Sequence, residues 1–428
     1  ALLAPAPRPP ARSEGRPPPA ARITCFGEAM LRYIPDPDAP ASGASDGGFT
    51  SRWLRGGGGA ELNITVALAR LGWGGQAKWV SVVPSGLLGD DFLRLLGQAY
   101  PDGRGEENLR LVRREEGDLG IYHVWPREHK LAYQRVRSVF GLMDPSWFSE
   151  DFWVQLLSSG AAEAQAGLHV LHLTGITPQI TPNAHKAWWK ALKAARTLKQ
   201  RAAQGSDAGA PRVVVTLDLN HRPALGTWED LWLMVEPHIS TLDLFVLSIG
   251  DLINIGELLG IEEAASIRGA KVAEGFAGAS ELDALLQKGL AAVQQRLGHR
   301  TAIAVTCKRR EPQPPGAETP LQLRWSMVCL RSGQVISTLP SAVRQRPREE
   351  IGGGDSWLSG VIDGLAGLSE PAAAAPSWSS ATWRAALQRG DMLAALKQQV
   401  IGDFCHVERD QLEAAIAAHK ASGGQEVL

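Results

Sequence analysis

Excess charge of either sign and long apolar runs are both missing from this 428-residue sequence, of which 44% is hydrophobic. The 44 Lys and Arg residues are balanced by 45 Asp and Glu residues, so the formal net charge is −1. A nearly neutral chain gives no argument for binding to nucleic acid or to an anionic membrane surface. No apolar run approaches the roughly 20 residues that span a bilayer. The composition suits one large or two modest soluble domains with a substantial core.

Cysteine is also scarce, and the four cysteines are far apart in the sequence. None of them forms a C-x-x-C pair, which argues against a structural zinc site and against a disulfide framework. Widely spaced free thiols fit a reducing compartment. The four residues are Cys25, Cys307, Cys329 and Cys405.

The first 22 residues lack aromatic side chains and contain a single acid, Glu14. A segment rich in Ala, Pro and Arg with so little apolar surface predicts a disordered leader, followed by a folded domain at residues 23–428. Arginine without acids is also a feature of organelle transit peptides. A plastid or other organellar location therefore stays open beside a cytoplasmic one.

Two common nucleotide-binding motifs are missing from the glycine-rich segment at residues 56–59. The segment has no Gly-Lys-Ser/Thr ending of a P-loop and no G-x-G-x-x-G spacing of a dinucleotide site. It is followed instead by Ala60-Glu61-Leu62-Asn63 and by a helical apolar pattern. P-loop chemistry and dinucleotide binding both lose support.

A second glycine-rich segment, Gly352-Gly353-Gly354-Asp355, precedes apolar residues at helical spacing. Glycines leave their backbone N–H groups uncovered, and a helix N-terminus adds unpaired donors, so an anion is expected there. A carboxylate beside a phosphate site is suited to take a proton from a hydroxyl that attacks the phosphate. The alternative is a helix cap after a flexible turn, since Asp is a favoured capping residue.

This segment resembles the signature of the ribokinase-like (PfkB) carbohydrate kinases, and the chain is most similar to their 2-keto-3-deoxygluconate kinases. The resemblance implies an α/β, ribokinase-like fold with a central, mostly parallel sheet, helices on both faces and a small β-strand lid from about residues 31–55 and 119–138. It implies ATP and Mg²⁺ as cofactors. It also implies that Asp355 is the general base and that Gly352, Gly353 and Gly354 form the anion hole.

The resemblance further implies which residues bind the sugar. Gly58-Gly59-Ala60-Glu61-x-Asn63 resembles a signature of the keto-deoxygluconate kinases, and the predicted hairpin at residues 119–138 resembles their lid. The planar guanidinium of Arg135 suits the carboxylate of a sugar acid, although an arginine in a surface hairpin is by default solvated charge. The substrate-binding candidates are Glu28, Gly59, Asn63, Tyr122, Tyr133, Arg135 and Arg222.

Nucleotide-binding candidates follow three predicted parallel strands. Asn220 belongs to an Asp-x-Asn-x-Arg pattern at a strand end, where ligands of open α/β sheets gather. The resemblance to the family implies that Asn220 points toward the phosphates. Ser248 and Asp251 stand for the Asn and Glu of the family's Asn-x-x-Glu element, which makes Asp251 the candidate metal ligand, although helix capping explains this pair equally well. Lys308 lies where many relatives have a glycine-containing loop under the nucleotide, and those glycines are missing here.

The predicted activity is ATP-dependent phosphorylation of a primary hydroxyl of 2-keto-3-deoxygluconate, with fructose as the alternative substrate. An alternative of another class is a catalytically inactive PfkB-fold scaffold in a larger assembly. The altered nucleotide loop, Gly250, and Glu349 in place of the family's usual Asp favour the scaffold, whereas Asp355 and the lid residues argue against it. The resemblance also implies a possible homodimer formed through the lid.

Overall fold

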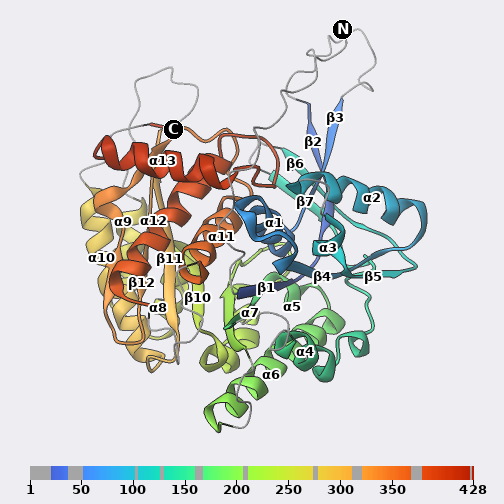
Figure 1. Cartoon of the computed structure of the whole chain (residues 1–428). Coiled ribbons are helices and arrows are strands. Elements are labelled where there is room, and N and C mark those ends of the chain that lie inside the picture. Colours follow the sequence, from blue (N-terminus) through green and yellow to red (C-terminus); the bar gives the residue numbers. More distant parts are fainter. Residues whose placement is uncertain are drawn as a thin grey trace, which may run out of the picture.

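The computed structural model describes residues 21–36, 52–101, 105–125, 130–159, 167–205, 211–272, 278–310, 321–367, 378–424 and 427–428. They form one large, mostly parallel sheet with helices on both faces and a separate small sheet (Figure 1). The predicted α/β class with its small second sheet is confirmed. No helix among these residues is long and apolar enough to cross a bilayer.

The large sheet has the strand order β13-β12-β11-β10-β9-β8-β1-β4-β5, with β14 paired to β12. Strands β11 to β5 along this order are parallel, and β12 runs antiparallel to β11. The parallel strands read as continuous apolar runs because both of their faces are covered. The strands are β1 (Ala21–Phe26), β4 (Ala77–Pro84), β5 (Leu111–Glu115), β8 (Leu168–Thr174), β9 (Arg212–Asp218), β10 (Leu244–Ser248), β11 (Ala302–Arg310), β12 (Gln322–Cys329), β13 (Val335–Ser337) and β14 (Val343–Gln345).

Each face of the large sheet packs against its own set of helices, which gives two separate apolar cores. The first face carries α1 (Ala60–Leu68), α11 (Gly353–Ala366), α12 (Ser380–Lys397) and α13 (Arg409–Ala421). The second carries α4 (Glu150–Ser158), α5 (Ile176–Ile180), α6 (Pro182–Ala203), α7 (Trp228–Val235), α8 (Ile249–Leu258), α9 (Glu263–Val272) and α10 (Ala279–Arg296). Two further helices, α2 (Gly86–Ala99) and α3 (Gly105–Leu109), lie beside β4. Short helical turns are η1 (Ala69–Trp73), η2 (Gly74–Gln76), η4 (Pro145–Phe148), η5 (Glu236–Thr241) and η7 (Leu339–Ser341).

Helices α11 and α12 are antiparallel and touch through glycines. A Cβ atom at Gly360 would come within 2.8 Å of the Cα atom of Gly390. One at Gly364 would come within 2.8 Å of the Cα atom of Ala386. Such close backbone approach leaves no room for larger side chains. As a result, the end of α12 lies next to the beginning of α11, where the glycine segment is.

The small sheet has the strand order β3-β2-β6-β7 and stands above the large one in Figure 1. Its strands are β2 (Met30–Pro35), β3 (Trp53–Gly58), β6 (Gly120–Trp125) and β7 (Lys130–Gln134). The first two overlap the predicted lid segment at about residues 31–55, and the last two lie inside the segment at residues 119–138. One face of this sheet packs Met30, Ile34, Tyr122 and Val124 toward Ile351 and Ile401. The other face joins the apolar cluster around α2. The lid is therefore packed against the segment that leads into the glycines.

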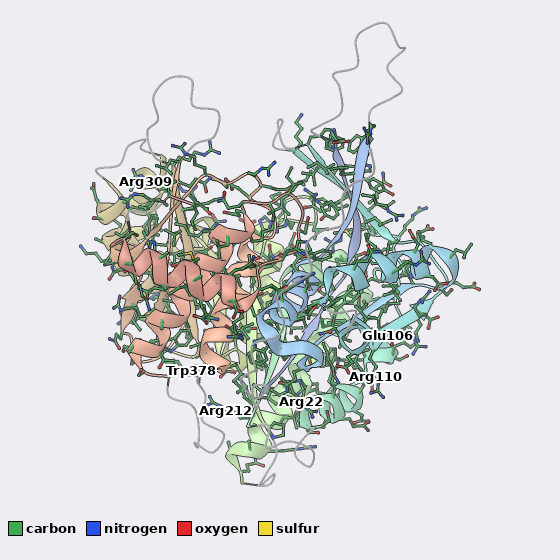
Figure 2. The ribbon with its side chains drawn as sticks, turned by 45° about the horizontal axis from the view of Figure 1, so that its top comes forward. Arg22, Glu106, Arg110, Arg212, Arg309 and Trp378 are labelled. Carbon is green, nitrogen blue, oxygen red and sulfur yellow. The ribbon has the colours of Figure 1, made fainter. Side chains whose placement is uncertain are left out.

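The carboxyl ends of the parallel strands point toward the lid. In Figure 2, Arg212 marks the side where the parallel strands begin, because it is the first residue of β9. Arg309, near the end of β11, marks the side where they end. The polar residues that follow β1, β9 and β10 therefore emerge on the lid side. This is the edge at which ligands of open α/β sheets bind.

Several predicted boundaries are wrong. Strand β1 begins at Ala21, not Ile23, because Ala21 and Arg22 pair with β8; residues 1–20 of the predicted leader lie outside the described residues. Strand β7 ends at Gln134, since the chain then turns with Ser138 N–H donating to Arg135 O. Strand β11 continues through residues 307–310, where a nucleotide loop was expected, because these residues pair with β12.

Candidate active site

The glycine segment forms the amino end of α11. Gly352 precedes the helix with φ of 73°, and a Cβ atom there would come within 2.3 Å of the backbone oxygen of Asp403. A glycine is therefore required at this position. Gly354 is exposed, and a Cβ atom on it would meet nothing within 4 Å. The first turn of a helix has N–H groups without partners in the helix, so this turn presents donors beside Asp355.

Asp355 is held by a side chain from α1. Asn63 Nδ2 donates a hydrogen bond of 2.6 Å to Asp355 Oδ2. Burial raises the pKa of Asp355 to about 6. The hydrogen bond from Asn63 and the positive charge of Arg222 oppose this rise. Two weaker effects follow: the charge of Asp403 raises the pKa and that of Lys397 lowers it. At neutral pH the carboxyl group is mostly ionised, yet it accepts a proton more readily than an ordinary aspartate. That combination suits a general base.

Two more carboxylates lie near Asp355, at the ends of β9 and β10. Burial raises the pKa of Asp218 to about 8, the charges of Asp355 and Asp251 add to the rise, and Arg222 lowers it. Asn220 adopts a left-handed φ of 44° and its N–H donates to Asp218 Oδ1 at 3.0 Å. The predicted residues Asn220, Arg222 and Asp251 are thus brought together with Asp355. Asp218 was quoted in the sequence pattern without being assigned a role.

Glu28 and Arg135 form a buried ion pair on the lid side. Arg135 Nε donates to Glu28 Oε2 at 2.7 Å, and Arg135 Nη2 lies 2.6 Å from the same oxygen. Ser138 Oγ donates to Glu28 Oε1 at 2.5 Å. A Cβ atom at Gly59 would come within 2.3 Å of the backbone oxygen of Glu28. The guanidinium that was predicted to bind a substrate carboxylate therefore already has a carboxylate partner inside the protein.

The two predicted tyrosines stack on one another across β6 and β7. The ring centroids of Tyr122 and Tyr133 are 5.9 Å apart, and the rings are inclined by 22°. Tyr122 is buried and Tyr133 is half-buried. A Cβ atom at Gly58 would come within 2.3 Å of Tyr122 Oη and 2.4 Å of Asp403 Oδ2. Tyr122 thus lies close to the segment that supports the glycines.

Glu61 is a buried acid whose pKa is affected both by Arg135, near the small sheet, and by Asp355, at the glycine segment. Its Oε1 accepts hydrogen bonds from Thr174 Oγ1 at 2.7 Å and Thr177 Oγ1 at 3.2 Å. Burial raises the pKa of Glu61 to about 7, against the Thr174 hydrogen bond and the charge of Arg135. The sequence motif contained this residue, but its depth under the site was visible only in the fold.

Ser248 and Asp251 form a capping box at the start of α8. Asp251 N–H donates to Ser248 Oγ at 3.2 Å, and Ser248 N–H donates to Asp251 Oδ2 at 2.9 Å. Trp228 Nε1 donates to Asp251 Oδ1 at 3.2 Å. Both carboxylate oxygens thus accept hydrogen bonds within the protein, and the capping interpretation accounts for the pair. Ser248 itself is exposed.

Lys308 lies on β11 and forms an ion pair with Glu350. Its side chain is 54% exposed, and the pair joins the end of β11 to the chain just before the glycines. Gln322 Nε2 also donates to Glu350 Oε1 at 2.5 Å. The position of Lys308 is set by a strand pairing and not by a loop.

Four buried charged side chains lie behind the glycine segment, two of each sign. Arg32 of β2 forms an ion pair with Glu349 and places its Nε atom 3.0 Å from Asp403 Oδ1. Glu349 Oε2 accepts a hydrogen bond of 2.6 Å from Gly402 N–H. Lys397 is fully buried and donates to the backbone oxygen of Ile351. We call Arg32, Glu349, Lys397 and Asp403 the charge cluster. Glu349 was noted in the sequence analysis as a departure from the family's usual Asp.

The carboxylates of the site fit a Mg²⁺ ion only if the phosphates of a bound nucleotide also act as ligands. Among the described residues there is no group of three or more His, Cys, Asp or Glu side chains placed to hold a metal ion. Burial, and then the charges of Asp355 and Asp251, raise the pKa of Asp218, and a cation would relieve the repulsion among the three carboxylates. Mg²⁺ in phosphoryl-transfer sites commonly uses one or two carboxylates, waters and the phosphates of the substrate.

No protein-family profile matches the chain. The sequence is 25% identical over 405 residues to the 2-dehydro-3-deoxygluconokinase of Bacillus subtilis, covering 92% of this chain and 95% of that protein. The structure superposes on the 2-dehydro-3-deoxygluconokinase of Thermotoga maritima with a TM-score of 0.65 and 21% identity, covering 93% and 98% of the two chains. The chain has the fold of the PfkB carbohydrate kinases.

A fructokinase is among the structures with this PfkB fold. The Xylella fastidiosa fructokinase with bound ATP superposes with a TM-score of 0.58 and 16% identity, covering 94% of this chain and 99% of that one. The predicted ribokinase-like fold and the resemblance to carbohydrate kinases are confirmed. These bacterial relatives lend no support to a plastid leader.

Proposed function

We propose that the protein transfers the γ-phosphoryl group of ATP to a primary hydroxyl of a sugar acid of the 2-keto-3-deoxygluconate type. The hydroxyl oxygen bonds to the γ-phosphorus, the bond to the β,γ-bridging oxygen breaks, and ADP leaves with that electron pair. Asp355 takes the hydroxyl proton. The N–H groups of the first turn of α11 stabilise charge on the transferred group.

The observation that carries this proposal is the pairing of a glycine-lined helix N-terminus with a positioned base. Asn63 fixes Asp355 at 2.6 Å, and burial brings the pKa of Asp355 to about 6. Capping does not account for Asp355, because Gly352 is the N-cap residue of α11 and no side chain forms a capping hydrogen bond there. Mg²⁺ bound with the nucleotide would neutralise phosphate charge, and Asp251, with Asp218 near it, would interact with its water shell.

Fructose remains the second candidate because Arg135 is already paired with Glu28. A neutral ketose needs no cation, whereas a sugar acid would have to use Arg222, which is half-buried and whose charge reaches both Asp355 and Asp218. The identity of the substrate therefore depends on Arg222.

Arg222→Ala tests this choice. A hydrogen bond to a charged group contributes about 1.5–3 kcal/mol, so kcat/KM for 2-keto-3-deoxygluconate is expected to fall by about 10- to 100-fold and that for fructose by less. Arg137→Ala is the matched control, because Arg137 is an exposed arginine beside the lid. Steady-state rates with both substrates give the answer. Equal losses, or a wild-type preference for fructose, would favour fructokinase; no phosphorylation and no ATP binding would favour the scaffold.

Gly354→Ala tests the anion hole without disturbing the fold. The added methyl group meets no neighbour, so the free energy of unfolding is expected to stay the same or rise by about 0.4–1 kcal/mol. The methyl group would obstruct the approach of phosphate, and kcat is expected to fall by about 10²-fold or more, as when an oxyanion donor is lost. Gly269→Ala in α9 is the control, since Gly269 is also helical, exposed and without neighbours within 4 Å. A wild-type kcat in Gly354→Ala would exclude phosphate binding at this turn.

We also propose that the protein forms a homodimer through the lid. Support comes from a row of rings on the strands of the small sheet. Tyr33 stacks on His123 at 5.5 Å, His123 stacks on Trp125 at 5.7 Å, and Trp53 packs edge-on against Trp125 at 5.9 Å. Trp53 is 36% exposed and the neighbouring Leu54 is 42% exposed. Exposed aromatic residues of this kind are enriched in protein interfaces.

A further inference from the structure

The last residue of α12, Lys397, lies beside the glycine segment on its buried side. Because α11 and α12 are antiparallel and locked by glycine contacts, the last residue of α12, Lys397, is fixed relative to the first turn of α11. The next residue, Gln398, lies so close to Gly353 that a Cβ atom there would be 2.3 Å from Gln398 Nε2. Gln398 Nε2 also donates to the backbone oxygen of Glu350 at 3.0 Å.

The ammonium group of Lys397 is buried and hydrogen-bonded. Lys397 has no exposed surface, its Nζ donates to the backbone oxygen of Ile351, and its Cε would be 3.2 Å from a Cβ atom at Gly352. Burial lowers the pKa of Lys397, and the charges of Asp403 and Glu349 oppose that change. A buried ammonium is costly without an oxygen partner; here the Ile351 carbonyl oxygen accepts a hydrogen bond from it, and Asp403 and Glu349 act on it as nearby negative charges. Such a group cannot contact a substrate directly.

The other cation of the charge cluster, Arg32, already pairs with both carboxylates. The four charges sum to zero, so removing the ammonium alone would leave a net charge of −1 behind the turn that must receive a phosphate. It would also free the Ile351 oxygen, one residue before Gly352. The positive charge of Lys397 lowers the pKa of Asp355, so its influence extends to the predicted base.

We propose that Lys397 is a positioning residue that serves as a built-in cation. Its ammonium holds the Ile351 carbonyl and keeps the first turn of α11 in the shape that binds the phosphoryl group. This inference rests on the proposed kinase function for its catalytic consequence, but the cation site itself does not depend on that function. The chemical consequence is specific: without the side chain, the site becomes a cavity that holds the unpaired Ile351 oxygen near two carboxylates, and it takes a small free cation.

The first arm of the test measures stability and needs no activity. The melting temperature of Lys397→Ala is expected to rise saturably with ammonium chloride, because a ligand that binds only the folded state stabilises it by mass action. Tetramethylammonium chloride, which is too large for the cavity, keeps the ionic strength constant. Lys199→Ala is the matched control: Lys199 donates to the Thr241 oxygen at 2.6 Å and pairs with Asp243 at the opposite end of the strands. Its side chain is 24% exposed and Asp243 keeps Arg331 as a partner at 3.0 Å, so water and Arg331 replace the lost ammonium. Wild type and Lys199→Ala are expected to show no ammonium response.

The second arm measures turnover. Misplacement of a catalytic group by about 1 Å is enough for a 10²-fold loss, so kcat of Lys397→Ala is expected to fall by about 10²-fold and to recover in part with ammonium. Lys397→Met fills the cavity without charge; it is expected to lose kcat similarly and to show no recovery. This variant also serves if Lys397→Ala does not fold.

Three results would overturn the inference. They are a wild-type kcat in Lys397→Met, an equal ammonium response in Lys397→Ala and Lys199→Ala, and no ammonium response in a folded Lys397→Ala. If wild type phosphorylates no sugar while ammonium stabilises only Lys397→Ala, the cation site stands and the proposed kinase function fails.

Discussion

Asp355→Asn is expected to abolish most turnover while leaving the protein at least as stable as wild type. Loss of a general base typically lowers the rate by about 10²–10⁴-fold. The amide keeps an oxygen that can accept the 2.6 Å hydrogen bond from Asn63. The measurement is kcat with ATP and the preferred sugar, together with the melting temperature at pH 7.

The stability half of this prediction follows from the raised pKa of Asp355. Because that pKa is about 6 in the folded protein and about 4 in an unfolded chain, folding favours the protonated form. The carboxyl group of Asp355 therefore makes its full favourable contribution to the free energy of unfolding below about pH 4, and this contribution is lost as the pH rises through about 6. Asparagine removes the penalty at pH 7, and its advantage should vanish below pH 4. The same pKa predicts that wild-type kcat/KM falls as the pH drops below about 6. Near-wild-type kcat in the variant would refute Asp355 as the base.

Arg32→Met is expected to cause the largest loss of stability. It leaves Glu349 and Asp403 buried without their cation, and breaking a buried ion pair in this way costs about 3–5 kcal/mol. The methionine occupies much of the same volume, so the loss reports charge more than packing. The free energy of unfolding from urea titration is the measurement.

Arg268→Met is the control for Arg32. Arg268 donates to both oxygens of Glu257, each at 2.7 Å, but the two side chains are 52% and 45% exposed. An exposed pair is screened by water, so this substitution should leave the free energy of unfolding almost unchanged. Similar losses in the two variants would mean that the charge cluster contributes little beyond an ordinary surface pair.

The small sheet was expected from the family resemblance, since its strand β2 pairs with β6 about 90 residues later. Local sequence was enough to predict individual strands and the helix after the glycines. Each depends on residues within about ten positions, such as Gly352 to Asp355 followed by helical apolar spacing. Helix α1 was different. Its apolar residues were expected to mark one face, yet eight of its nine residues are buried because the helix lies between the sheet, α11 and the lid side. Periodicity cannot reveal a helix that is covered on all sides.

The parts of the site that sequence did not supply are contacts between distant segments. Arg32 and Glu349 are 317 residues apart, and nothing in either neighbourhood points to the other. The partner of Arg135 was equally hidden, because a motif gives a residue type and not the side chain opposite it. The capping box of Asp251 was weighed from sequence, and only the fold showed that both of its carboxylate oxygens are engaged. The strand at residues 307–310 depended on pairing with β12 across an intervening segment.

The position of β1 in the large sheet has a consequence for synthesis of the chain. This first strand is central, paired with β4 on one side and with β8 on the other. Cys25 of β1 pairs with His172 of β8, so about 150 residues must be made before that edge is covered, which takes roughly 7–30 s at usual elongation rates. Until then the apolar β1 is exposed on one edge to other nascent chains. We therefore expect a ribosome-bound intermediate that ends before β8 to aggregate more readily than the full chain.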